Sequence, residues 1–112
     1  MFRETRGNDG QKPLSVPFSF ALLNPSASFG GLYVPESLPT IDLIFLKEAT
    51  QKSYKELTID ILKLFHIDIE DDVIHEAVSL YDHFDNPNYP VPLRQIRNDL
   101  FVNALFHGRT RA

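Results

Sequence analysis

The sequence contains no cysteine and no tryptophan. Without cysteine, disulfide bridges, thiolate catalysis and cysteine-ligated zinc are excluded within these residues. Basic side chains are also few, because 11 Lys and Arg stand against 15 Asp and Glu and leave a net charge of −4. A protein that binds nucleic acid needs a basic face for the phosphates, so this balance argues against nucleic acid as a partner.

Long apolar runs are missing as well. A membrane-spanning helix needs about 20 consecutive apolar residues, and no stretch of this sequence approaches that length. Residues 1–11 are polar and lack the apolar segment of a secretory signal. We therefore expect no membrane partner and a cytoplasmic location, with which the absence of cysteine is compatible.

What the sequence does contain is enough apolar bulk for one small core. Hydrophobic residues make up 43% of the 112 positions, and nine Phe and four Tyr supply most of the large side chains. A chain of this length fits a single small domain. The pattern along it predicts a helix-rich α+β fold, with short strands at both ends and helices between them.

Two helices are the strongest prediction. The first begins after Ser53, where the sequence Ser-Tyr-Lys-Glu is a capping box. The second is expected over about residues 70–84, with acidic residues in its first turn, where the helix dipole favours them. Ile74 and Val78 widen its main apolar stripe, which is Val73, Ala77, Leu80, Tyr81 and Phe84. The core predicted between the two helices is Leu57, Ile61, Phe65, Val73, Leu80 and Tyr81.

The remaining elements are shorter. We expect a strand within residues 2–6, a turn at 7–10, an extended segment at 32–34, and helices over about 17–23 and 40–47. Ser15 and Thr40 are the predicted caps of those two helices. Near the end, Asn98-Asp99 predicts a tight turn, followed by a strand at 100–106 that is apolar on both faces and so suits burial on both sides.

Motifs that would carry chemistry are weak when the residues are considered alone. His75 and His83, with Asp82 or Asp85, lack the spacing of a metal-binding helix, so we predict no metal site. The acidic residues 68–72 lack the spacing of a calcium loop. The pair Gly30-Gly31 matches no phosphate-binding pattern and is interpreted as a structural turn.

Six segments, taken in order, resemble one family, threonine synthase. They cover nearly the whole chain: Thr5-Arg6-Gly7, residues 19–23 (SFALL), 30–36 (GGLYVPE), 53–57 (SYKEL), 90–93 (PVPL) and 107–112 (HGRTRA). The last resembles the family's F-H-G-x-T-x-A-F-K-D signature, in which the lysine carries pyridoxal phosphate. The chain departs from the family pattern at Ala104, Arg109 and Arg111, where Glu, Pro and an aliphatic residue are usual.

The resemblance implies the N-terminal domain of a fold-type-II enzyme that depends on pyridoxal phosphate and makes L-threonine from O-phospho-L-homoserine and water. It implies a boundary, with residues 1–99 as the N-terminal domain and 100–112 as the start of the catalytic domain. The cofactor-bearing lysine is expected beyond Ala112, so no catalytic residue is expected within the chain. We expect the 112 residues alone to be inactive and to hold no cofactor.

The resemblance also indicates candidate binding residues. His107, Gly108 and Thr110 flank the expected lysine and are assigned to the cofactor, with His107 either bracing the loop or acting in the chemistry. Arg6 is the candidate for the substrate phosphate, and the alternative is a structural arginine paired with a carboxylate. A competing hypothesis for the whole chain is a non-catalytic helical interaction module, and we expect the exposed apolar strand to favour self-association.

Overall fold

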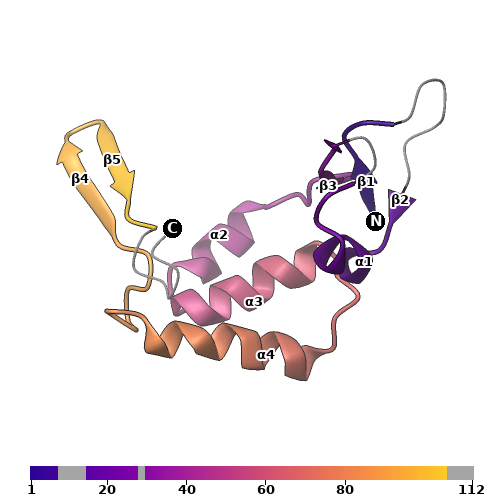
Figure 1. Ribbon diagram of the computed structural model, residues 1–112. Coiled ribbons are helices and arrows are strands. Elements are labelled where there is room, and N and C mark those ends of the chain that lie inside the picture. Colours follow the sequence, from indigo (N-terminus) through magenta and orange to yellow (C-terminus); the bar gives the residue numbers. More distant parts are fainter. Residues whose placement is uncertain (8–14, 28–29, 106–112) are drawn as a thin grey trace.

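The protein is described by a computed structural model, which covers residues 1–7, 15–27 and 30–105. The molecule is elongated, measuring 47 × 30 × 30 Å. Its radius of gyration is 16.9 Å, against about 13 Å for a compact domain of this length. In chain order the elements are a small sheet with one helix, three further helices and a hairpin. The sheet lies at one end of the molecule, the further helices form the middle and the hairpin projects from the other end (Figure 1). The predicted α+β class is confirmed.

The N-terminal sheet has three antiparallel strands in the order β2-β1-β3. Its bounds are β1 (Phe2–Glu4), β2 (Ser15–Val16) and β3 (Tyr33–Pro35), so both predicted extended segments are confirmed. Glu36, just after β3, accepts hydrogen bonds from the Ser15 hydroxyl at 2.7 Å and from Arg3 at 3.3 Å. The predicted turn at 7–10 falls mainly outside the described residues.

Two of the predicted helix caps, Ser15 and Thr40, are wrong. Helix α1 (Phe18–Leu23) begins after Pro17, because Ser15 belongs to β2 and its hydroxyl bonds to Glu36 instead. Helix α2 (Leu43–Ala49) begins after Asp42, whose carboxylate accepts the backbone N–H of Phe45 at 2.8 Å. Thr40 therefore lies before the helix, since the carboxylate two residues later takes the cap position.

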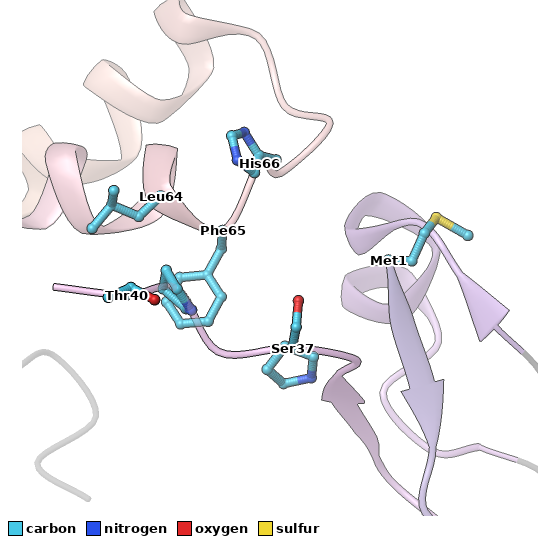
Figure 2. A pocket seen from close by; sticks show the side chains of 8 residues that line it. Met1, Ser37, Thr40, Leu64, Phe65 and His66 are labelled. Carbon is cyan, nitrogen blue, oxygen red and sulfur yellow. The ribbon is translucent and has the colours of Figure 1, made fainter.

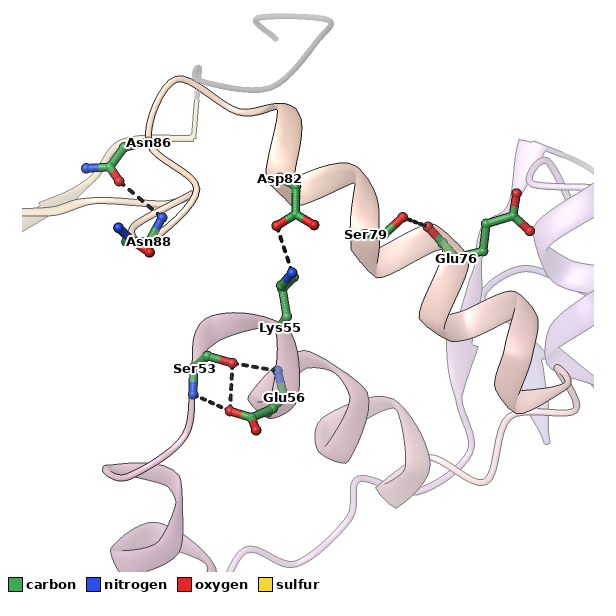
Figure 3. Close-up of polar contacts among 8 residues, drawn as sticks. All are labelled: Ser53, Lys55, Glu56, Glu76, Ser79, Asp82, Asn86 and Asn88. Carbon is green, nitrogen blue, oxygen red and sulfur yellow. Dashed lines mark hydrogen bonds and ion pairs between the residues drawn. The ribbon is translucent and has the colours of Figure 1, made fainter.

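The two long helices form as predicted, but the second buries a different stripe. Helix α3 (Tyr54–Leu64) has the expected capping box (Figure 3). Helix α4 (Asp71–Ser79) continues into a 3₁₀ turn, η2 (Leu80–His83). Ile74 and Val78 are 4% and 5% exposed, whereas Val73 and Leu80 are 53% and 51% exposed. The predicted core residues Val73 and Leu80 are thus wrong, because α4 packs along α3 on the neighbouring face.

The C-terminal hairpin consists of β4 (Leu93–Arg97) and β5 (Leu100–Asn103), which pair antiparallel. The predicted turn at Asn98-Asp99 joins them, and a register shift lies between Gln95 and Arg97. Every residue of both strands is exposed. In the part of the chain that the structure describes, the burial predicted for this strand is therefore absent, because β5 and its partner β4 are exposed along their whole length.

Candidate functional site

Arg6 lies against the Gly30-Gly31 turn, and two hydrogen bonds set this contact. Thr5 donates its backbone N–H to the carbonyl of Leu32 at 2.8 Å, and its hydroxyl accepts the N–H of Leu32 at 2.9 Å. A Cβ at position 31 would come within 3.1 Å of the Arg6 nitrogen and 3.2 Å of the Arg6 Cβ. Glycine is therefore favoured at 31, because a side chain there would push the Arg6 backbone away by a few tenths of an ångström.

Gly30 is favoured for a different reason. Its φ is +73°, in the left-handed region that side chains other than glycine rarely adopt. A Cβ there would lie 3.7 Å from the Arg6 Nη1 atom, so the guanidinium group itself is next to this residue. The interpretation of Gly30-Gly31 as a structural turn agrees with this geometry, and the turn also places a cation beside exposed backbone.

This arrangement is chemically suited to an anion with several oxygens. A guanidinium group offers parallel N–H donors that match a phosphate or carboxylate. The neighbouring Arg3 pairs with Glu36 at 3.3 Å. The hydroxyl of Ser15 and then Arg3 hold the pKa of Glu36 below its usual value, so that carboxylate remains charged at neutral pH. The role of Arg6 toward a substrate stays a prediction.

The other predicted binding residues, His107, Gly108 and Thr110, lie outside the described residues, as do Arg109 and Arg111. Ala104 is described and is 4% exposed. Its N–H donates to the carbonyl of Pro92 at 2.9 Å, which closes the base of the hairpin. A small side chain suits this buried position, which gives a physical reason for alanine where the family pattern has glutamate.

The residues considered for a metal are scattered. His75 and His83 are both exposed. Within residues 1–7, 15–27 and 30–105, no three or more His, Asp or Glu side chains gather closely enough to hold an ion. The acidic segment is used for polar contacts instead, since Asp71 pairs with Lys63 at 3.0 Å and Asp68 bonds to Ser19. Within the same ranges, no helix is both long and apolar enough to span a bilayer.

Sequence reasoning missed a cavity of about 370 Å³ between the sheet and the helices (Figure 2). Met1 and Pro35 line it from the sheet, and Phe65 and His66 line it from the end of α3. His66 adopts a φ of +48°, which is unusual for a residue with a side chain. The lining residues are far apart in the sequence and share no motif, so no local signal could have found the cavity.

Comparisons with known proteins agree on one family. Residues 1–80 match the family model described as threonine synthase N terminus. Threonine synthase of Schizosaccharomyces pombe is 29% identical over 99% of this chain and 21% of its own length. Threonine synthase of Pseudomonas aeruginosa is 33% identical over 92% of this chain and 22% of its own. Mouse threonine synthase-like 2 is 35% identical over 87% of this chain and 20% of its own.

The fold agrees as well. The crystal structure of threonine synthase from Brucella melitensis with pyridoxal phosphate bound aligns over 99% of this chain with a TM-score of 0.77 and 32% identity. That alignment covers 23% of the Brucella chain. The present chain thus spans about a fifth of the length of the relatives it matches. By the match to the N-terminal model and the agreement of fold, the chain belongs to the threonine synthase family.

Proposed function

We propose that the chain is the N-terminal part of an enzyme that converts O-phospho-L-homoserine and water to L-threonine and phosphate in the cytoplasm. The observation that carries this proposal is the alignment of 99% of the chain with the threonine synthase that has pyridoxal phosphate bound. Because the chain spans about a fifth of its relatives, the activity belongs to the longer protein and not to these residues alone.

We propose that two domains follow one another along the sequence. Residues 1–99 act as the N-terminal domain, and residues 100–112 begin the catalytic domain. The bare hairpin supports a need for further protein, since an isolated hairpin is marginal in water and this one exposes apolar side chains on both strands. The proposed boundary falls at the turn of the hairpin, so β5 would lead from the first domain into the second.

Pyridoxal phosphate, when bound, supplies an electron sink for reactions at the substrate carbons. On this proposal it is held by the lysine beyond Ala112 together with the segment of His107, Gly108 and Thr110. The lysines of these 112 residues lie outside that motif, so we propose that the chain alone neither binds the cofactor nor catalyses. Binding at the substrate phosphate is what the described residues can contribute.

Arg6 is the residue we assign to that phosphate. Its guanidinium lies beside Gly30, and the adjacent Gly31 lets the backbone approach without a side chain in the way. A planar fork of N–H donors suits phosphate oxygens, and lysine does not reproduce it. We expect Arg6→Lys to raise KM for the phosphorylated substrate in the complete enzyme. Arg3→Lys, three residues earlier, is the matched control and should leave KM nearly unchanged.

The reaction itself can be tested with a chimera. The relatives carry two names, threonine synthase and threonine synthase-like 2, and this chain is about equally identical in sequence to both groups. The two products of the proposed reaction, L-threonine and phosphate, must therefore both be measured. Residues 1–112 would be joined to the part of the Pseudomonas aeruginosa enzyme that follows the match. We expect phosphate and L-threonine in equal amounts. Phosphate without threonine would contradict the proposed water addition, and an intact chimera that releases neither product would contradict the proposed function.

A further inference from the structure

One carboxylate joins the N-terminal sheet region to the helices. Asp68 lies in the connection between α3 and α4, and it bonds to Ser19 on α1, 49 residues earlier. It accepts the backbone N–H of Ser19 at 2.9 Å and also the Ser19 hydroxyl. The bond thus links two parts of the chain that are far apart in sequence.

This contact supplies the N-terminal cap of α1, which the residue at the N-cap does not provide. The first N–H groups of a helix have no partner within the helix, and a side chain at the N-cap usually provides one. Here the N-cap is Pro17, which makes no side-chain cap bond. Asp68 takes over this role from a distance. The Ser19 hydroxyl and then the Ser19 N–H lower the pKa of Asp68, so the cap carries a full negative charge at neutral pH.

Helix α1 is in turn fixed to the sheet by aromatic contacts. Phe18 packs on Phe2 of β1 with ring centroids 5.3 Å apart. Phe20 meets Tyr33 of β3 edge to face at 6.4 Å. Because Arg6 lies two residues after the end of β1 and Gly31 lies two residues before β3, α1, the sheet and that contact form one body.

The seam between this body and the helices contains a cavity. The cavity of about 370 Å³ lies along it, with Met1 on one side and Phe65 on the other (Figure 2). An extended segment that includes Pro39 connects the two parts before α2 begins. Packing is incomplete at the cavity, and the hydrogen bonds of Asp68 to Ser19 are a contact across the seam that does not depend on that packing.

We infer that Asp68 is a positioning residue, which holds α1 and the Arg6 loop in one orientation relative to α3 and α4. Its oxygen atoms act as a remote helix cap, and loss of the cap releases the whole N-terminal body. This inference does not depend on the proposed reaction, since it can be measured on the chain itself.

The test uses the absence of cysteine, because two introduced cysteines can then be spin-labelled without background. Leu23→Cys, on the 81% exposed end of α1, and Glu76→Cys, on the exposed face of α4, place one label in each part. Pulsed electron resonance should give one narrow distance distribution. Asp68→Ala should broaden it, while Asp72→Ala, which removes an equal charge four residues later, should leave it narrow. Asp68→Asn retains an acceptor oxygen and should also leave it narrow.

A second measurement does not need the labels. The N–H of Ser19 should exchange with solvent about tenfold faster in Asp68→Ala than in Asp72→Ala, because its acceptor has been removed. Far-ultraviolet circular dichroism would establish that the Asp68→Ala chain retains its helices. The inference is overturned if Asp68→Ala matches Asp72→Ala in both the distance distribution and the exchange rate, or if Asp72→Ala broadens the distribution equally.

Discussion

The α3–α4 pair and the β4–β5 hairpin are built alike and differ in what covers them. Each consists of two antiparallel neighbours joined by a short connection (Figure 1). The helices bury Ile74 and Val78, and the ion pair of Lys55 with Asp82 at 2.7 Å also joins them (Figure 3). The hairpin exposes Leu93 by 63% and Phe101 by 50%. The helix pair therefore buries part of its apolar surface within this chain, whereas the apolar side chains of the hairpin stay exposed in the part of the chain that the structure describes.

The largest effect on stability should come from substitutions in the buried stripe of α4. Ile74→Ala removes a side chain that is 4% exposed and should lower the free energy of unfolding by about 2–4 kcal/mol. Small domains have about 5–15 kcal/mol in total, so the melting midpoint should fall clearly. Val73→Ala, at a position that is 53% exposed, is the control and should change stability far less. Equal effects would contradict the observed packing of α4.

The second largest effect on stability should come from loss of the capping box of α3. Ser53→Ala removes the hydroxyl that accepts the N–H of Glu56, and loss of such a cap costs about 0.5–2 kcal/mol. Ser79→Ala removes a hydroxyl that donates to the carbonyl of Glu76 in its own turn, and this variant serves as the control. Urea denaturation of both variants measures the difference. A Ser53→Ala chain as stable as the parent would mean that the box adds nothing to the helix pair.

The elements that the sequence predicted correctly are those set by local signals. The capping box at Ser53 and the turn at Asn98-Asp99 are local signals, and both elements form where expected. The buried face of α4 was predicted wrongly because the apolar residues form a stripe wider than the face that α3 can cover. Which part is buried depends on the position of α3, and periodicity alone does not contain that information.

In the candidate site, too, local signals were predicted and contacts between distant residues were not. The glycine pair and Arg6 were singled out by short segments, and the structure brings them into contact. Asp68 as the cap of α1 had no local signal, since its partner Ser19 is 49 residues away. Ser15 and Thr40 were plausible caps by residue type, yet strand pairing engaged the first and Asp42 displaced the second.

Protonation of Glu56 at acidic pH should lower the stability of the helix pair. Hydrogen bonds from Ser53 hold the pKa of Glu56 below 4.5, so the carboxylate form is favoured in the folded chain. A lowered pKa contributes stability above the unfolded value and loses it as the pH falls through the folded value. The difference in melting midpoint between the parent and Glu56→Gln should therefore shrink below about pH 4.5. A difference that stays constant down to pH 3 would contradict the assigned hydrogen bonds.

The smallest effect on stability should come from the hairpin. Phe101→Ser changes a side chain that is half exposed, so stability of the chain should change by no more than about 0.5 kcal/mol. Self-association should weaken in the same variant, because apolar surface has been removed. Light scattering over a concentration series measures this. Association that is unchanged by Phe101→Ser would show that the hairpin is not the contact surface.

Hydrogen exchange at the hairpin tests most directly whether the chain is one part of a larger enzyme. In the 112-residue chain at low concentration, the amides of β4 and β5 should exchange much faster than those in the middle of α3 and α4, because the hairpin lies in solvent. In the chimera with the remainder of the Pseudomonas aeruginosa enzyme, the hairpin amides should become as protected as the helices. Hairpin amides that exchange equally fast in the chimera, or that are already protected in the chain alone, would contradict the account.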